Sequence, residues 1–341
     1  VPVPTPPEYF DVPPWSAETI VRLACPAYVF PNPDVPADEL WDAPSPLRGK
    51  SQITNHKFQK AFEICDLRFE FPRAAGKWLE RLELFAPPLL TRAIRFVTER
   101  LRGDRWRSYV RRCRRQGVEL SGVVYVCIFN PHDGRKNWQD LLTGFVSAFH
   151  DRPDATLLIK LITAEPLMVD RVLDFYRSVG LSHRCKIAFI TDYLSDEHML
   201  ALVRASTYYL TTTRAEGNCL PLMNYLAAGR PGIAPCHTAL ADYFDADVGL
   251  TLPWHAEPAA WPQDNRVRLK TTWARLDWPT LVERLRESHA LALHDRRAYD
   301  ARADRARQRL RERASVESVQ TQLHTALAYL DEIPTRDIRA A

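Results

Sequence analysis

The stretch that decides the fold is VVYVCIFN, residues 123–130, which leads through the loop PHDGRK into NWQDLLTGFVSAFH at 137–150. The first segment is a continuous apolar run, typical of a strand that is buried on both faces. The second segment carries its apolar residues at helical spacing. A buried strand that continues through a short loop into a helix predicts the first strand–helix unit of a parallel sheet.

The same alternation continues toward the C-terminus, where short apolar runs are separated by segments of helical period. We expect strands at 155–162, 185–190, 207–213, 231–235 and 248–252, with helices at 166–180, 195–206 and 219–228. Helices of this length imply right-handed crossovers, so the expected fold class is α/β, a Rossmann-like parallel sheet with flanking helices. Ligands of such sheets bind at the carboxyl ends of the strands. This rule selects the loops at 129–137, 162–166, 191–195, 212–219 and 235–240.

Two zones of different composition precede the alternation. Residues 1–50 are rich in Pro with scattered aromatics, which predicts a linker or wrapping segment with little regular structure. Residues 51–117 are expected to be mostly helical and basic. Their amphipathic part at 89–115 either packs on another domain or lies on an anionic membrane surface. The nucleotide-binding domain is expected over 118–295, and a helical extension over 296–341.

Composition excludes several classes of protein. With 341 residues, 46% of them hydrophobic, the chain is long enough for one or two real cores. A net charge of only +4 gives no indication of a nucleic-acid partner, and no apolar run approaches the ~20 residues of a membrane span. The seven Cys are scattered, which favours free thiols in a reducing cytoplasm over a disulfide framework. The first residue is Val, and we expect a further domain upstream.

The loop after the first strand carries two cations, Arg135 and Lys136, at the ligand edge of the sheet. Cations beside the free N–H groups of a helix start form an anion site. A solvated loop pair is the alternative interpretation. Asp133 is expected to shape the turn rather than to act as a base.

A second loop of the same kind lies in RAEGNCLPLMNYLAAGRPG, residues 214–232. Gly217 allows close approach of a ligand to the backbone, and a helix begins just after it. Pro221 is tolerated in the first turn, where its missing N–H costs nothing. A diphosphate at this helix start would face the two cations, and Glu216 would lie beside the phosphates.

These segments resemble the donor-binding half of GT-B glycosyltransferases of the family 4 type, also called glycosyl transferases group 1. RAEGNCLPLMNYLAAGRPGIAP is similar to the E-x7-E region of that family. FNPHDGRKNWQDLLTGFVSAFHDRPDATLLIKL is similar to the start of its donor domain, and DYLSDEHMLALVRASTYYLTTTRAEG to the segment between the two. The match covers about residues 120–253 in collinear order. It implies a C-terminal nucleotide-sugar domain and transfer with retention at the anomeric carbon, without metal or other cofactor.

The resemblance also implies a role for each residue that matches a family motif. Arg135 and Lys136 would bind the donor phosphates, and Glu216 would contact the donor sugar; these three are the expected catalytic residues. Asn224 falls on the second glutamate, which usually binds the ribose hydroxyls. Tyr193 and Leu194 would lie near the nucleobase. The other expected donor-binding residues are the backbone amides of Gly217, Asn218, Cys219 and Leu220, together with Asn130, Asp133 and His237.

Three positions depart from the family pattern. Asn224 is neutral, so it offers a bond of ~0.5–1.5 kcal/mol where a charged group offers ~1.5–3, and donor binding would weaken by roughly tenfold. Pro131 stands where the family has an arginine. Lys160 replaces a glycine-rich strand end and either enters the cleft or points to solvent. For His237, a contact with donor or acceptor and the absence of any role are equally open.

The expected function is therefore the donor-binding part of a hexosyl- or deoxyhexosyltransferase in polysaccharide biosynthesis, with a glycan or lipid-linked acceptor. It would act in the cytoplasm, with the inner face of the cell membrane as an alternative. An upstream acceptor domain would complete the site, so the chain alone is expected to bind donor weakly. The rival interpretation is a non-catalytic nucleotide-sugar- or carbohydrate-binding domain that kept the half-fold, and a third is a nucleotide-sugar epimerase.

Overall fold

The computed structural model describes residues 2–30, 106–163, 165–260, 266, 268 and 270–332. They fall into two compact units, which we describe separately. The first comprises Val1–Pro31, Arg114–Tyr176 and Leu181–Ala341, and the second comprises Asn32–Cys113 and Arg177–Gly180. In the second unit, residues 106–113 form a helix. Residues 51–105 of the expected helical zone 51–117, including most of the amphipathic stretch 89–115, lie outside the described residues. At the end of this zone Arg114–Arg115 form a strand, not a helix.

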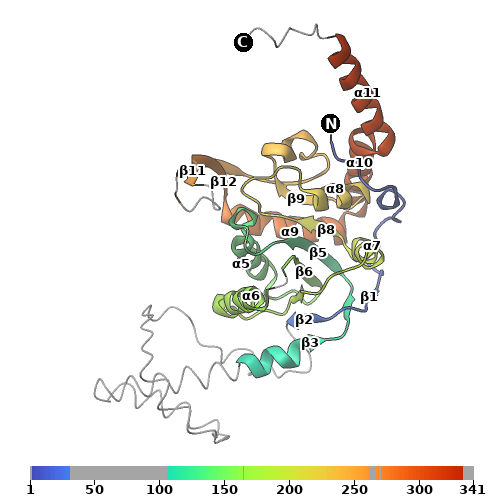
Figure 1. The fold of residues 1–341 in the computed structure, drawn as a ribbon. Coiled ribbons are helices and arrows are strands. Elements are labelled where there is room, and N and C mark those ends of the chain that lie inside the picture. The colour runs from blue at the N-terminus through green and yellow to red at the C-terminus, as the bar shows by residue number, and fades with distance from the viewer. Residues whose placement is uncertain are drawn as a thin grey trace, which may run out of the picture. The chain divides into compact units, whose positions relative to one another are not determined.

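The first unit is built on an eight-stranded sheet with the strand order β10-β9-β8-β5-β6-β7-β2-β3 (Figure 1). Its six consecutive parallel strands are β5 (Val123–Phe129), β6 (Ala155–Leu161), β7 (Lys186–Ile190), β8 (Tyr208–Leu210), β9 (Gly232–Pro235) and β10 (Gly249–Leu252). Every residue of β5 and β6 is buried, as expected for central strands that are covered on both faces. The predicted α/β fold class with a parallel sheet is confirmed.

The Pro-rich segment contributes more regular structure than its composition indicates. β2 (Ala27–Phe30) pairs antiparallel with β7, and β3 (Arg114–Arg115) pairs with β2. β1 (Val21–Leu23) and β4 (Val118–Leu120) form a separate two-stranded sheet. The expectation of little regular structure in residues 1–50 is therefore wrong for β1 and β2, because both pair with strands from distant parts of the chain.

All three helices predicted between the strands after residue 165 are present, and so is the helix at 137–150. They are α5 (Trp138–Phe149), α6 (Pro166–Val179), α7 (Asp196–Ala205) and α8 (Leu220–Ala227). Ser195 caps α7 by accepting the N–H of His198 at 3.3 Å, and Gly180 follows α6 in the left-handed conformation. Three further helices close the chain: α9 (Trp278–His294), α10 (Arg296–Ala314) and α11 (Val316–Glu332).

Alternate residues of β5 serve two cores, as the period of a strand requires. Val124 and Val126 belong to the core beneath α7, α8 and α10. Tyr125 points to the other face, where the centre of its ring lies 5.3 Å from that of Phe145 of α5. Its hydroxyl oxygen is hydrogen-bonded to that of Ser288 of α9 at 2.9 Å. The sheet is thus a middle layer, and its strand ends remain at the two edges.

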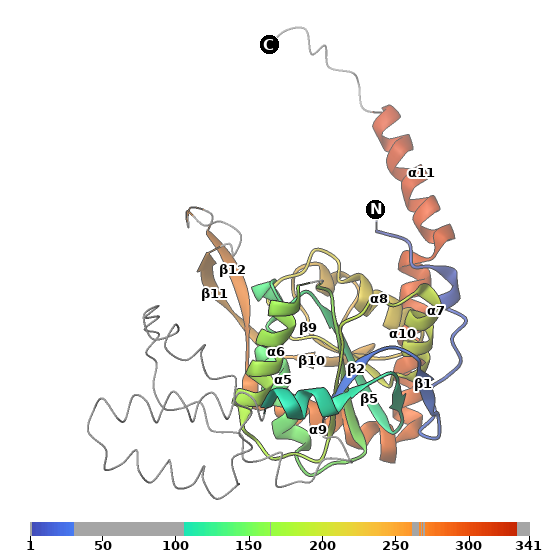
Figure 2. The same cartoon turned by 60° about the horizontal axis from the view of Figure 1, so that its bottom comes forward.

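A hairpin that the sequence analysis did not predict follows β10. It consists of β11 (Trp254–Ala260) and β12 (Lys270–Leu276), paired antiparallel from Trp254 opposite Leu276 to Ala260 opposite Lys270. Figure 2 shows this hairpin standing off from the main sheet. Its base lies next to the carboxyl end of β10, at the edge where ligands of parallel sheets bind.

The N-terminal residues 2–16 lie along α8 and α10. Arg307 of α10 donates to the carbonyl of Val12 at 3.0 Å, and Arg296 donates to the carbonyl of Trp15. The guanidinium of Arg296 also lies over the Trp15 ring, 5.2 Å from its centre. These contacts fix the segment on the helices, as the wrapping interpretation expects.

Arg230 lies at the centre of this arrangement and is only 1% exposed. Its guanidinium donates to four backbone carbonyls, those of Val203, Arg204, Ala228 and Pro13. Burial lowers its pKa, and no carboxylate is among these partners. The carbonyl oxygens alone compensate its buried charge, and one of them belongs to the N-terminal segment.

Candidate functional site

The loop after β5 is a short turn that presents two cations. Asp133 caps the 3-10 turn Gly134–Lys136 by accepting the N–H of Arg135 at 3.1 Å. The same carboxylate binds the Arg135 guanidinium at 2.6 Å, and this hydrogen bond raises the pKa of Arg135. Asn130 accepts the N–H of His132 at 3.0 Å and closes the start of the loop. The turn-shaping role predicted for Asp133 is what the structure shows.

Lys136 and Glu216 form the central pair of the site. The ammonium of Lys136 lies 2.5 Å from the Glu216 carboxylate, with the two side chains 20% and 6% exposed. Burial acts to lower the pKa of Lys136, but the adjacent carboxylate holds it above its ordinary value. Lys136 is therefore charged at neutral pH, and its bond to Glu216 joins the loops that follow β5 and β8.

Hydroxyl groups at the end of β8 lock these two loops together. Thr212 donates to the carbonyl of Asn137 at 2.9 Å, and Thr213 donates to the carbonyl of Arg135 at 3.3 Å. Arg214 adds a backbone bond to the Arg135 carbonyl at 2.7 Å and a side-chain bond to Asn137 at 3.0 Å. This role of the threonines was not predicted from the sequence. The signal that could have indicated it is the run of three successive polar residues at the end of a buried strand.

A hydrogen-bonded chain continues from Glu216 to the loop after β9. The N–H of Glu216 donates to the Thr238 hydroxyl at 3.0 Å, and this hydroxyl lies 3.0 Å from Nδ1 of His237. Nε2 of His237 lies 2.9 Å from the carbonyl of Thr213, which can only accept, so the hydrogen-bond network assigns the proton to Nε2. Burial lowers the pKa of His237 and keeps the ring neutral. Because both ring nitrogens are engaged, His237 supports the Glu216 loop.

Backbone strain marks the same place. Of the non-glycine residues that the structure describes, those with positive φ are Asn137 at 49°, Cys219 at 54° and Thr238 at 47°. Each follows the carboxyl end of one of three adjacent strands, β5, β8 and β9. Such residues cost on the order of 1–3 kcal/mol each and persist where the surrounding contacts enforce them, which is frequent at binding sites.

The start of α8 forms the wall beside Glu216. The N–H groups of its first turn lack acceptors within the helix, and a Cβ added to Gly217 would meet nothing within 4 Å. Tyr243 donates its hydroxyl to the carbonyl of Asn218 at 2.7 Å and fixes the loop from behind. Burial and then the nearby Glu216 raise the pKa of the Cys219 thiol to about 12, so it stays protonated. The loop can hold an anion but offers no thiolate.

The remaining predicted donor residues lie outside this network. Tyr193 is 89% exposed, whereas Leu194 is buried in the core, so only its backbone can reach a ligand. Asn224 lies near the hydroxyl of Tyr9, a buried residue of the N-terminal segment. Burial raises the pKa of Tyr9, and the nearby Asn224 opposes the rise. The position expected to meet a ribose thus lies beside the N-terminal segment of the chain itself.

Lys160 is buried, with 8% of its surface exposed, and its ammonium donates to the carbonyl of Leu161 at 2.6 Å. The interpretation in which it points to solvent is therefore wrong, because the strand end is covered by neighbouring elements. Burial lowers its pKa, and the nearby Asp192 partly offsets this.

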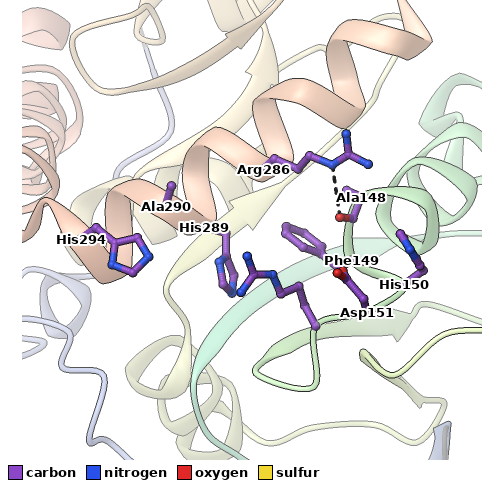
Figure 3. Close-up of a pocket in the computed structure, with 9 residues that line it drawn as sticks. Ala148, Phe149, His150, Asp151, Arg286, His289, Ala290 and His294 are labelled. Atoms are coloured by element: carbon purple, nitrogen blue, oxygen red, sulfur yellow. Dashed lines mark hydrogen bonds between the residues drawn. The ribbon is translucent and has the colours of Figure 1, made fainter.

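A cavity of about 270 Å³ lies at the opposite edge of the sheet, between the end of α5, the loop before β6 and α9 (Figure 3). Its lining residues are Ala148, Phe149, His150, Asp151, Arg152, Arg286, His289, Ala290 and His294. Arg286 donates to the carbonyl of Ala148 at 3.4 Å, and His289 lies 3.3 Å from the Asp154 carboxylate. Arg286 lies at the carboxyl end of α5, where a cation complements the helix dipole, so its position is explained without a ligand.

The described part of the chain holds neither a candidate metal site nor a candidate membrane span. No group of three or more His, Cys, Asp or Glu residues there is arranged to hold a metal ion. None of the helices described is both long and apolar enough to cross a bilayer.

No family model matches the chain, and no curated protein matches it. Three similar solved structures are the sucrose-phosphate synthase of Thermosynechococcus elongatus, the C-terminal domain of the Francisella tularensis glycosyl transferase group 1 family protein LpcC, and Anabaena HepE, solved with UDP and glucose. Their sequence identities to this chain are 16%, 15% and 14%, with TM-scores of 0.44, 0.42 and 0.42. The matches cover 61%, 58% and 61% of this chain, and 45%, 89% and 48% of the other.

The chain therefore spans less than half the length of the synthase and of HepE. Glycosyltransferases are thus among the structural neighbours of this chain, at identities and TM-scores too low to assign it an activity.

Proposed function

We propose that this chain is the donor-binding part of a retaining glycosyltransferase, which transfers a hexosyl or deoxyhexosyl group from a nucleotide diphosphate sugar to a glycan or lipid-linked acceptor. The observation that supports this most is the partly buried Lys136–Glu216 pair at the carboxyl ends of β5 and β8. A cation and a carboxylate fixed side by side suit a ligand that joins an anionic diphosphate to a hydroxylated ring.

The diphosphate would lie between the loop of Arg135 and Lys136 and the start of α8. There the two side chains and the free N–H groups of the first helical turn supply positive charge. Lys136 would exchange its bond with Glu216 for one with a phosphate oxygen, and Glu216 would then accept hydroxyls of the donor sugar. Gly217 leaves open space in front of this loop.

In the proposed reaction the acceptor hydroxyl attacks the anomeric carbon on the face from which the diphosphate departs. The bond between that carbon and the phosphate oxygen breaks as the bond to the acceptor oxygen forms. The acceptor proton passes to the leaving phosphate oxygen. Arg135 and Lys136 stabilise the negative charge that develops there, so the proposal requires no metal or other cofactor.

The proposal also includes an acceptor-binding domain, because the described sheet supplies one side of a donor site. It keeps a cytoplasmic location and a role in polysaccharide biosynthesis. The inner face of the cell membrane is where a lipid-linked acceptor would meet the enzyme. No nucleic-acid partner is part of it.

A second candidate function is a non-catalytic nucleotide-sugar-binding domain. The proximity of Asn224 to Tyr9 favours it, since the N-terminal segment lies beside the amide expected at the ribose. The two candidates differ in one observable property. A transferase slowly hydrolyses its nucleotide sugar when water replaces the acceptor, whereas a binding domain leaves the donor intact.

Calorimetric titration with UDP, GDP and their sugars tests the donor site. We expect one of them to bind the wild-type chain, and Lys136→Met or Arg135→Ala to weaken it by roughly tenfold or more, the size of a lost charged hydrogen bond. Arg286→Ala, at the opposite edge of the sheet, is the matched control and should bind as the wild type does. If no nucleotide binds at millimolar concentration, the proposal fails. If the Lys136 and Arg135 variants bind normally, the phosphate assignment is wrong.

A further inference from the structure

Three neighbouring parallel strands bring three residues to one row at the carboxyl edge. The sheet order is β10-β9-β8, and both pairs are parallel, so their carboxyl ends lie side by side. Glu216 lies in the loop after β8, His237 in the loop after β9, and Trp254 directly after β10. Two strand spacings separate the first from the last, which is about 10 Å.

Trp254 is exposed but held in a fixed orientation. The side chain lies at the start of β11, and the residue is 42% exposed. Its indole N–H donates to the carbonyl of Cys236 at 2.9 Å. The ring meets the buried His237 ring at 84°, with 5.4 Å between the centres. An exposed aromatic ring that is immobilised in advance loses little entropy when a ligand stacks on it.

Polar contacts connect this ring to the central pair of the site. His237, against which Trp254 packs, is bonded to Thr238, and Thr238 accepts the N–H of Glu216. A second contact fixes the hairpin to the same loop: the N–H of Ala274 in β12 donates to the carbonyl of Arg214 at 2.9 Å. The Trp254 ring is therefore positioned relative to Glu216 by side-chain and backbone bonds together.

We propose that Trp254 is a stacking platform for a saccharide ring of the acceptor, so that the acceptor presents a carbohydrate to this site. The inference rests on the proposed function, in which the donor sugar lies at Glu216. A pyranose has an apolar face of C–H groups, which suits a flat indole, and a rim of hydroxyls, which suits the adjacent polar network. The distance of two strands leaves room for one ring at Glu216 and for a neighbouring ring at Trp254.

The competing explanation is that Trp254 only anchors the base of the hairpin. Its bond to Cys236 and its contact with His237 would then serve stability alone. The chain offers a matched control in Trp278, the first residue of α9, which is 37% exposed and donates its indole N–H to Thr143 at 3.1 Å. Trp278 has the same kind of anchored, exposed indole, but it does not lie in the row of Glu216, His237 and Trp254.

The test follows the indole N–H signals of the full chain by nuclear magnetic resonance. The Trp254 signal is identified by its absence from Trp254→Phe. The probes are methyl α-D-glucopyranoside, methyl α-D-mannopyranoside, methyl β-D-galactopyranoside and N-acetylglucosamine, each added with and without UDP. We expect at least one to shift the Trp254 signal and to leave that of Trp278 in place.

Affinity measurements on the variants complete the test. Trp254→Ala should weaken binding of that saccharide by about fivefold, the size of one lost aromatic contact, while Trp254→Phe stays close to wild type. Trp278→Ala should bind as the wild type does, and UDP affinity should be unchanged in all three. The inference is overturned if no saccharide moves the Trp254 signal, or if Trp254→Ala binds normally. A failure of UDP to bind would instead refute the donor site and leave the saccharide result intact.

Discussion

At the carboxyl edge of the sheet, Lys136 and Glu216 come from loops after two different strands and pair at 2.5 Å. At the amino edge, Arg286 and His289 both come from α9, where they bind the end of α5 and the loop before β6. The first edge concentrates backbone strain and cross-strand hydrogen bonds. The second has a cavity of about 270 Å³, and Arg286 in its lining completes the carboxyl end of α5.

The difference teaches that a cavity and a network of cross-strand bonds mark different places in this fold. The Arg286 guanidinium at the end of α5 is satisfied by carbonyls of that helix. At the other edge, opposite charges are held together by threonine hydroxyls and by residues in costly conformations. The proposed donor site lies at that other edge.

The largest expected effect on stability comes from leaving one charge of the carboxyl-edge pair alone. Lys136→Met removes the partner of a Glu216 carboxylate that is 6% exposed. We expect the free energy of unfolding to fall by about 2–3 kcal/mol, as for a lost charged hydrogen bond in a buried setting. Urea unfolding would measure this. The double variant Lys136→Met, Glu216→Gln should recover most of the loss; equal losses in the single and double variants would contradict a coupled pair.

The next effect is a pH dependence that both edges share. Burial lowers the pKa of His237 at one edge and of His289 at the other. Below about pH 6.5 these two histidines bind protons in the unfolded chain but stay neutral in the folded chain. Their full contribution to stability is therefore present above that pH. It then falls by up to about 1.4 kcal/mol per pH unit for each such histidine, until the lowered folded pKa is reached.

Unfolding curves at a series of pH values between neutral and acid check this expectation. His237→Gln and His289→Gln should each remove part of the slope, and their double variant should remove the sum. A third buried histidine, His183, also has a lowered pKa and accounts for slope that remains. A stability that rises on acidification would show that these rings are charged in the folded state.

A smaller effect concerns ligand binding at the carboxyl edge. In the free protein the Glu216 carboxylate competes with phosphate for Lys136. Glu216→Gln should therefore tighten the binding of UDP, which carries no sugar, by about fivefold, or roughly 1 kcal/mol. Calorimetry would measure it, with Glu257→Gln on the hairpin as a control carboxylate. Weaker UDP binding in Glu216→Gln would mean that Glu216 positions Lys136 instead of competing for it.

The smallest effect should come from the amino edge. Arg286→Ala removes a cation from the carboxyl end of α5, which is worth about 0.5 kcal/mol of stability. Thermal unfolding should detect this small loss, and nucleotide binding should not change. Weakened UDP binding in this variant would show that the two edges are coupled. It would contradict the expectation that only the carboxyl edge takes part in nucleotide binding.

The parallel strands and their helices were predictable because β5 and β6 are uninterrupted apolar runs and the intervening helices have clear period. The hairpin was not, because β11 reads WHAEPAA, which lacks alternation and contains Pro258. The antiparallel strand β2 was hidden in a Pro-rich segment. Its place in the sheet depends on pairing with β7, which lies about 160 residues away and leaves no local signal.

The candidate site shows the same division. Arg135, Lys136 and Glu216 could be assigned to one edge from the order of strands alone. That Lys136 would pair with Glu216 depends on side-chain conformations in two loops 80 residues apart, which no local pattern encodes. The proximity of Asn224 to Tyr9 was equally hidden, since it brings a helix beside a segment that local sequence rules treat as a linker.

The arginines that hold the N-terminal segment also set an order of events during synthesis. The contacts of Arg230, Arg296 and Arg307 with that segment span 217, 281 and 295 residues of chain. The N-terminal segment is thus synthesised well before the helix that holds it, and its contacts with Arg296 and Arg307 must wait until α10 has emerged. Long-range closure of this kind slows folding. Until the segment has docked, the buried guanidinium of Arg230 lacks one of its carbonyl acceptors, so this part of the core is completed late.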